Sequence, residues 1–161
     1  MHSITYYTLL IFYKICQSIE NFFYRKDKDF SLTALENARQ NVANCRDMEA
    51  WHRSTGFVYQ PDHKFLDYGR SPWVTYLKKH GDCDDMMLLN EYILKGKYRN
   101  IMKAFVYSKT AGHAILLLSR GDVWYVMSNT YCTGPYTSKE NAIKSIFGDN
   151  TIAYFIFERG A

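Results

Sequence analysis

Clustered positive charge, the mark of a face that binds phosphates, is absent from this chain of 161 residues. The net charge is only +4, and acidic residues are scattered among the basic ones, so the sequence predicts no nucleic-acid partner. Internal repeats, low-complexity tracts and linkers are absent too. At this length we expect one domain, residues 1–161, whose core needs no disulfide.

The cysteines show no Cys-x-x-Cys spacing and no regular framework. The N-terminus has neither a basic n-region nor a small-residue cleavage site. The sequence therefore predicts reduced thiols and a cytoplasmic location. We expect Cys16 and Cys45 to be core residues. The four cysteines are Cys16, Cys45, Cys83 and Cys132.

A long apolar run that spans a bilayer is also missing, because the apolar segment from Ile4 to Ile15 is too short. Its apolar residues continue at helical spacing and form one stripe. We expect an amphipathic helix that lies on the core or on a partner. Attachment to a membrane surface is the alternative, although the helix lacks a strongly basic polar face. The stripe consists of Ile4, Ile11, Ile15, Ile19 and Phe22.

What the chain does have is Cys83, within Gly-Asp-Cys-Asp-Asp at the start of a predicted helix. Asp82 is the expected N-cap, and Asp85 stands where a capping box places its acidic residue. Cys83 would then lie at the positive end of the helix dipole, which favours a nucleophilic thiolate. The neighbouring carboxylates oppose that effect, and the alternative is a buried cysteine in a well-capped helix.

His113 is the expected base for this thiol. It precedes a predicted hairpin of residues 114–119 and 123–128. A three-residue turn places Asn129 opposite His113, on the same face and close enough to orient the imidazole. A two-residue turn at Gly121-Asp122 places Thr130 there instead.

These residues resemble the transglutaminase-like superfamily of papain-fold cysteine enzymes, above all the bacterial and phage transglutaminase-like cysteine proteinases. The similarity runs through Asp67–Tyr76, Gly81–Asp85 and Gly112–Ala114 to Ser128 and Asn129. The third catalytic residue of that family is most often Asp, whereas Ser128 and Asn129 stand there here. The resemblance implies a substrate groove before the cysteine helix. Asp82 and Ser128 would lie close to the substrate, and the candidates for a second oxyanion donor beside the Cys83 N–H are Gln60 and Trp73.

The remaining patterns predict an α+β fold, which agrees with the papain-like, transglutaminase-like arrangement that the resemblance implies. Helices dominate residues 1–50, one of them beginning at the cap Ser31 and carrying Cys45 on its apolar stripe. A charged connection precedes it at residues 25–29. A long loop covers 51–69 with a short strand at 57–59, and residues 67–130 hold the motifs. Strands at 101–107 and 151–157 join the hairpin in an antiparallel sheet of about four strands, and a helix covers 138–147.

The sequence thus predicts a cysteine acyl-transfer enzyme that acts on a protein or peptide through Cys83, His113 and Asn129 and a thioester intermediate. Water would resolve the thioester in a peptidase or amidase and an amine would do so in a transglutaminase; the residues leave both open, and the resemblance favours hydrolysis. The resemblance implies a phage or bacterial protein, in a host cytoplasm or virion if viral. The alternative is a catalytically degenerate fold that serves as a protein-binding or virion structural module. We expect no cofactor. We expect no metal either, because the Asp-Cys-Asp side chains of one helical turn should not converge on one ion.

Overall fold

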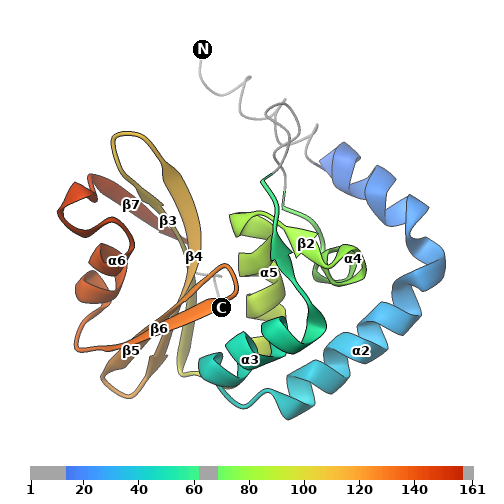
Figure 1. The fold of residues 1–161 in the computed structure, drawn as a ribbon, viewed down its shortest axis with the longest axis horizontal. Coiled ribbons are helices and arrows are strands. Elements are labelled where there is room, and N and C mark those ends of the chain that lie inside the picture. Colours follow the sequence, from blue (N-terminus) through green and yellow to red (C-terminus); the bar gives the residue numbers. More distant parts are fainter. Residues whose placement is uncertain (1–13, 62–68, 158–161) are drawn as a thin grey trace.

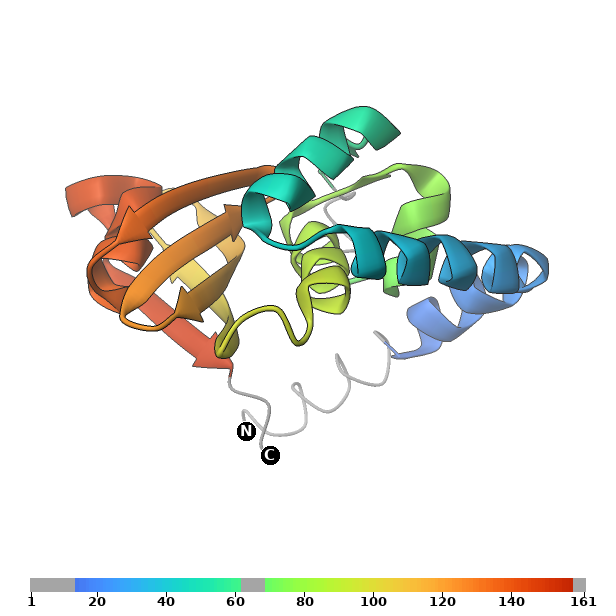
Figure 2. The same cartoon turned by 90° about the horizontal axis from the view of Figure 1, so that it is seen from below.

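The structure is a computed structural model that describes residues 14–61 and 69–157. An antiparallel sheet of five strands lies at its centre, in the order β6-β5-β4-β3-β7. Helix α6 covers one face of the sheet, and α5 lies on the other face with the remaining helices beyond it (Figure 1; Figure 2). The strands are β3 (Asn100–Tyr107), β4 (Gly112–Arg120), β5 (Val123–Ser128), β6 (Tyr131–Tyr136) and β7 (Ala153–Phe157).

The helical layer is built from the N-terminal half of the chain. A helix at residues 14–23, here the N-terminal helix, leads through a short 3-10 turn into α2. The further elements are η1 (Arg25–Asp27), α2 (Lys28–Asn41), α3 (Cys45–Thr55), β1 (Val58–Tyr59), α4 (Pro72–Lys78), β2 (His80–Gly81), α5 (Cys83–Leu94), α6 (Lys139–Phe147) and η2 (Gly148–Asn150). The predicted α+β class is confirmed. The sheet has one strand more than expected, because the turn-forming Gly134 and Pro135 inside β6 disguised a strand.

Strand β4 contributes side chains to both hydrophobic cores, one on each face of the sheet. Its apolar run alternates between two cores, because successive side chains of a strand point to opposite faces. Leu116 and Leu118 pack in the core that includes α5, whereas Ile115 and Leu117 pack in the core that includes α6. All four side chains are fully buried. The uninterrupted apolar sequence of this strand is therefore the signature of a central strand covered on both faces.

Two helix boundaries differ from the prediction. The expected second helix is interrupted after α2, where Asn44 accepts hydrogen bonds from the N–H groups of Arg46 and Asp47 and starts a new helix, α3. Helix α3 continues to Thr55, so the loop expected from residue 51 was wrong over its first five residues. Ser31 does not cap α2. It lies inside the helix and donates its hydroxyl to the carbonyl of Asp27.

A disulfide joins Cys45, the first residue of α3, to Cys132 in β6. This contradicts the predicted reduced state of these two cysteines, whose sequence separation of 87 carries no recognisable spacing signal. The bond ties the helical layer to an edge strand of the sheet. It also removes the main support for the cytoplasmic prediction, which stays a prediction.

The N-terminal helix faces the opposite way from the core-packing prediction. Its described stripe residues Ile15, Ile19 and Phe22 are exposed, whereas Glu20 is buried. Ile4 and Ile11 lie outside the described residues. Among residues 14–61 and 69–157, no helix is long and apolar enough to cross a bilayer.

Candidate functional site

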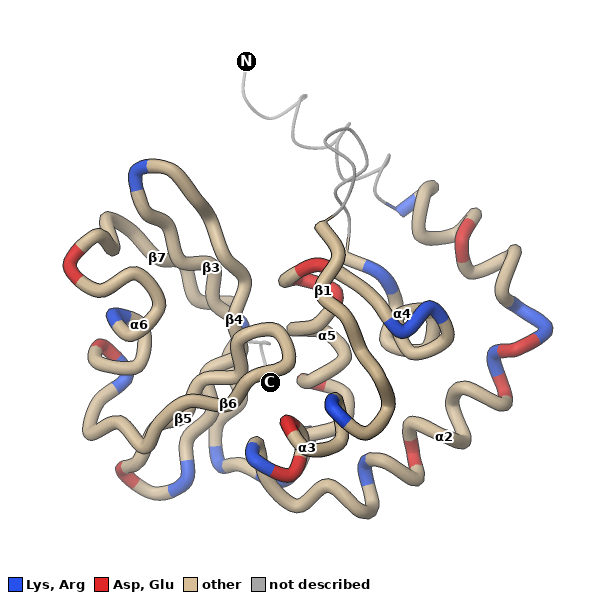
Figure 3. The backbone as a smooth tube through the Cα atoms, viewed as in Figure 1, with Lys and Arg blue, Asp and Glu red and all other residues tan. Residues whose placement is uncertain are grey.

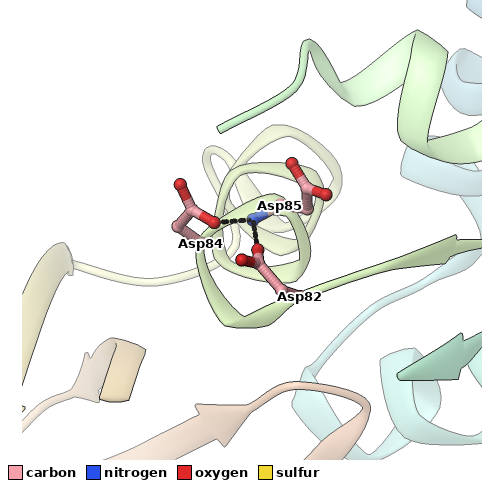
Figure 4. Close-up of side chains that lie close together, drawn as sticks. All are labelled: Asp82, Asp84 and Asp85. Carbon is pink, nitrogen blue, oxygen red and sulfur yellow. Dashed lines mark hydrogen bonds between the residues drawn. The ribbon is translucent and has the colours of Figure 1, made fainter. Parts of the chain in front are cut away.

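Cys83 is the first residue of α5, as the sequence predicts. Asp82 has the extended backbone of an N-cap, and its carboxylate accepts a hydrogen bond of 3.3 Å from the N–H of Asp85. Asp84 accepts from the same N–H at 3.1 Å, so two carboxylates converge on one donor in the first turn (Figure 4). The predicted cap is confirmed, and it holds the thiol at the positive end of the helix.

Asp85 has a different task from the one predicted. It is fully buried, and its carboxylate accepts a hydrogen bond of 2.5 Å from the N–H of Arg70 and forms an ion pair with the Arg70 guanidinium. It therefore fastens the chain before α4 to the cysteine helix and is not a capping-box residue. Gly81 is required beside it, because a Cβ at residue 81 would lie 2.6 Å from the Asp85 Cβ.

The thiol of Cys83 is poorly disposed to ionise. Burial, together with the carboxylates of Asp82 and Asp84, raises its pKa to about 11, although the backbone N–H groups of Ala114 and of Cys83 itself act in the opposite direction. The acids thus act against the helix dipole as the sequence argument anticipated. The thiol is overwhelmingly protonated at neutral pH.

His113 lies near the start of β4 and hydrogen-bonds Ser128, with 2.8 Å between Nε2 and Oγ. The hairpin has the two-residue turn, because Arg120 pairs with Val123. Extending that register places Thr130 opposite His113, and Ser128, two residues earlier, becomes the diagonal neighbour on the same face. The structure therefore gives His113 the partner Ser128 in place of the expected Asn129.

Cys83 approaches β4 at Ala114, the residue directly after His113. The backbone N–H of Ala114 lies close enough to the thiol to lower its pKa. Burial lowers the pKa of His113, so the ring is neutral at neutral pH. Within residues 14–61 and 69–157 no hydrogen bond joins the thiol to the imidazole directly. With Nε2 bonded to Ser128, Nδ1 is the ring nitrogen left for the thiol.

The aspartates also bear on metal binding. One oxygen from each of Asp82, Asp84 and Asp85 lies within 4.8 Å of the others, so these carboxylates lie close together, whereas Cys83 is not part of the group. Asp85 is engaged by Arg70. Asp82 and Asp84, whose carboxylates flank the Asp85 N–H, are the residues of this group that suit a cation (Figure 4).

Solved structures share this architecture. Legionella pneumophila LapG in its calcium-bound form superimposes with a TM-score of 0.52 at 16% identity, covering 87% of this chain and 80% of that one. Legionella pneumophila LapG in another structure gives 0.51 at 17% identity, covering 89% and 83%, and its EGTA-treated form gives 0.52 at 15%, covering 81% and 76%. The chain has a transglutaminase-like fold. No family model matches the sequence, and no curated protein does either.

In this fold the segment before the cysteine helix was expected to supply an oxyanion donor. Strand β1 pairs in parallel with β2, and the N–H of Gln60 donates to the carbonyl of Gly81 at 2.9 Å. Gln60 thus lies beside the residues that lead into Cys83, with an exposed side chain. Trp73 is not brought there. It is buried among the core residues of α4, and Lys28 lies 6.0 Å from its ring centroid.

Asn90 and His52, which were not among the predicted site residues, support the turn after β5. Asn129 has a positive φ of 51°, and its carbonyl accepts a hydrogen bond of 2.8 Å from Asn90 of α5. The Asn90 side-chain oxygen lies 2.7 Å from Nε2 of the buried His52. Burial lowers the pKa of His52 to about 4. The sequence signal that could have identified Asn90 is its polar side chain on the otherwise apolar, buried face of α5.

A hollow opens beside the first turn of α5. It measures about 270 Å³ and is mainly apolar, with one carboxylate and one ammonium group at its edge. Such a pocket suits an apolar side chain of a bound peptide. Its lining residues are Asp84, Met87, Leu88, Lys103, Phe105 and Phe157.

Proposed function

We propose that the protein is a cysteine peptidase or amidase in which Cys83 attacks a carbonyl carbon and His113 moves the proton. One observation carries this proposal: the thiol at the start of α5 lies close enough to the N–H of Ala114 for that group to lower its pKa, and the neighbouring residue, His113, has its ring hydrogen-bonded to Ser128. A nucleophile, a base and a group that orients the base are the parts of a cysteine acyl-transfer site.

The reaction would proceed in two halves. In the first, Nδ1 of His113 takes the thiol proton while sulfur bonds to the carbonyl carbon, and the backbone N–H of Cys83 stabilises the oxyanion. The tetrahedral intermediate expels the amine, which receives the proton from the imidazolium and leaves a thioester on Cys83. In the second half, water gives a proton to His113 and attacks the thioester. The leaving sulfur recovers that proton, and a carboxylic acid is released.

The resting state of this pair is neutral. A thiol pKa of about 11 against an imidazole pKa below its ordinary 6.5 makes proton transfer unfavourable by at least about 6 kcal/mol before the two charges attract each other. A preformed thiolate–imidazolium pair is therefore not the ground state. His113 acts as a general base during the attack, and the imidazole turns towards the thiol once substrate is bound.

Ser128 holds the ring at the place where Asn129 was expected and where the resembling family most often has Asp. Its hydroxyl fixes the orientation of the imidazole but brings no charge to stabilise the imidazolium. Replacing it with Asp would supply that charge. We expect the Ser128→Asp variant to raise kcat and to shift the acidic limb of the pH profile of kcat, since a neighbouring carboxylate raises the pKa of His113.

The structural neighbours agree with this proposal at a coarser level, because LapG is a cysteine protease of this fold. For the same reason we propose that water, and not an amine, resolves the thioester. The phage or viral origin and the location inside a host or virion remain expectations from the sequence.

Calcium is part of the proposal, since one of the similar LapG structures is calcium-bound. Carboxylate oxygens are the ligands that this ion prefers, and Asp82 and Asp84 would hold it here. The ion would supply positive charge that offsets the two carboxylates beside the thiol. We expect calorimetric titration to show Ca²⁺ binding that is lost in Asp82→Asn/Asp84→Asn and retained in Asp149→Asn, an exposed acid of η2.

The test of activity is cleavage of a peptide library, read by mass spectrometry in the presence and absence of Ca²⁺. Cleavage should be abolished in Cys83→Ala and fall at least about 100-fold in His113→Ala. Cys16→Ser serves as the matched control, because Cys16 is the other free cysteine among the described residues. Cleavage that survives in Cys83→Ala would contradict the assignment.

A protein-binding module without catalysis is the second candidate. The raised pKa of Cys83 and the lowered pKa of His113 favour it, because both shifts oppose a reactive thiol. A folded wild-type protein that cleaves nothing in the library, with or without Ca²⁺, would support this candidate over the enzyme.

A further inference from the structure

The N-terminal helix is attached to the domain by its polar side. Three of its polar side chains point inward and meet the segment around the start of α4. Gln17 donates to the carbonyl of Gly69 at 3.0 Å, and Asn21 accepts from the Ser71 hydroxyl at 2.8 Å. Glu20 is buried and lies 3.4 Å from the Arg70 guanidinium, with Lys78 as a second ion-pair partner. The inward side chains are Gln17, Glu20 and Asn21.

The apolar side of the same helix is left uncovered. Ile15 is 50% exposed, Ile19 52%, Phe22 71% and Phe23 70%; these four residues are here called the apolar face. At 3.6 residues per turn they lie opposite the three inward polar residues. This is the reverse of a surface helix that packs on its own core. The bonds of Gln17, Glu20 and Asn21 fix the rotation of the helix and thereby keep the apolar face outward.

A basic pocket adjoins the apolar face. It has a volume of about 260 Å³ and is lined by Ser18, Asn21, Phe22, Arg25, Lys28 and Trp73. Phe22 belongs both to this pocket and to the apolar face. Arg25 and Lys28 are exposed, and they come from the turn between the N-terminal helix and α2. Figure 3 shows Lys and Arg in this turn, at the end of the molecule farthest from the sheet. Two cations with hydroxyl and amide groups suit a phosphate.

We propose that this side of the protein binds the surface of an anionic phospholipid bilayer, with the apolar face in the acyl–headgroup boundary and Arg25 and Lys28 on lipid phosphates. Apolar and cationic groups side by side are the requirement for interfacial binding. The sequence continues the character of the face, since residues 1–13 contain no Asp, Glu, Lys or Arg.

Charge selects the bilayer over a second copy of the chain. A second copy would offer the cations at positions 25, 26 and 28 only its own acids Asp27 and Asp29 beside the same three cations, and thus no excess of negative charge. An anionic bilayer neutralises the same cations. The inference is independent of the proposed peptidase activity, because none of these residues belongs to the site around Cys83.

The test is co-sedimentation of the full chain with vesicles of phosphatidylcholine alone and with 30% phosphatidylglycerol, about one lipid in three being anionic. We expect binding to the anionic vesicles that weakens with salt. Ile19→Ser/Phe22→Ser should lower the partition constant at least about tenfold, since each apolar side chain contributes to interfacial binding. Arg25→Gln/Lys28→Gln should lower it severalfold and remove most of the salt dependence.

The matched control is Ile152→Ser/Phe155→Ser, which removes an exposed isoleucine and phenylalanine from the region of β7. Equal loss in this control, or no binding of the wild type to anionic vesicles at low salt, overturns the proposal. Saturation of the basic pocket by inorganic phosphate, with vesicle binding unaffected by Ile19→Ser/Phe22→Ser, overturns it in favour of a free-anion site. A dimer in lipid-free buffer that dissociates in the same variant overturns it in favour of self-association. Circular dichroism verifies that each variant is folded.

Discussion

The ionisation of Cys83 offers the sharpest test of the site, because the structure attributes its raised pKa to named causes. Burial is the largest, and the carboxylates of Asp82 and Asp84 act in the same direction. The perturbation is Asp82→Asn/Asp84→Asn. Asparagine caps a helix about as well as aspartate, so this variant removes two charges while α5 keeps its start.

The size of the pKa shift limits how much the thiolate population can increase. The pKa stands near 11 against an ordinary value of 9.0, and each unit of decrease gives tenfold more thiolate at a fixed pH below it. Removing every cause would therefore raise the thiolate population about 100-fold. Since burial persists in the variant, we expect a smaller gain, about three- to tenfold at pH 8. His113→Ala should change little, because the neutral imidazole is not among the causes.

The assay is the rate of iodoacetamide alkylation at Cys83 from pH 7 to pH 11, followed by mass spectrometry of the Cys83 peptide, with Asp149→Asn as the charge control. A wild-type midpoint at or below the free-thiol value of about 8.5 would refute the reasoning. So would a variant that reacts no faster than the wild type. A midpoint that rises in His113→Ala would show instead that an ion pair exists at rest.

Three further predictions concern stability. Burial lowers the pKa of His52 from 6.5 to about 4, so between these pH values the unfolded state binds a proton that the folded state excludes. The free energy of unfolding should therefore fall by about 2 kcal/mol from pH 8 to pH 5. Urea titrations of His52→Gln should show a flatter pH dependence. Reduction of the Cys45–Cys132 bond, which closes a loop with a separation of 87 residues, should cost about 4.6 kcal/mol by the loop-entropy relation; a reductant should lower the Tm of the wild type and leave that of Cys45→Ser/Cys132→Ser unchanged. Gly81→Ala places a methyl group 2.6 Å from the Asp85 Cβ and should destabilise the fold by about 2 kcal/mol. Thermal unfolding measures the loss.

The elements around the site were predictable because their signals are local. The N-cap and first turn of α5 depend on residues within four positions of one another, and the strands β4 and β5 are long apolar runs around a turn-forming pair. The sequence prediction failed where contacts join distant segments. Nothing near Asp85 in the sequence indicates that its carboxylate will pair with Arg70. Nothing near Cys45 indicates Cys132 as its disulfide partner.

The rotation of the N-terminal helix was mispredicted for a similar reason. Its spacing correctly indicated one apolar stripe, and a stripe normally faces the core. The orientation was decided instead by the bonds of Gln17, Glu20 and Asn21 to partners about fifty or more residues away. Helical periodicity reveals the two sides of a helix but not which side the rest of the protein will bind.

The residue that binds the His113 ring depends on the register of the β4–β5 hairpin, and a shift of one residue changes its identity. A turn of three residues would have placed the Asn129 side chain opposite His113, and a turn of two makes Ser128 the diagonal neighbour. With the two-residue turn, Asn129 instead adopts a positive φ in the turn after β5, and its carbonyl accepts a hydrogen bond from the Asn90 side chain. Both residues are polar, so composition gives no preference between them, and only the hydrogen-bonded ladder does. Burial lowers the pKa of His113, and the serine that this register places beside the ring brings no charge to counter that shift.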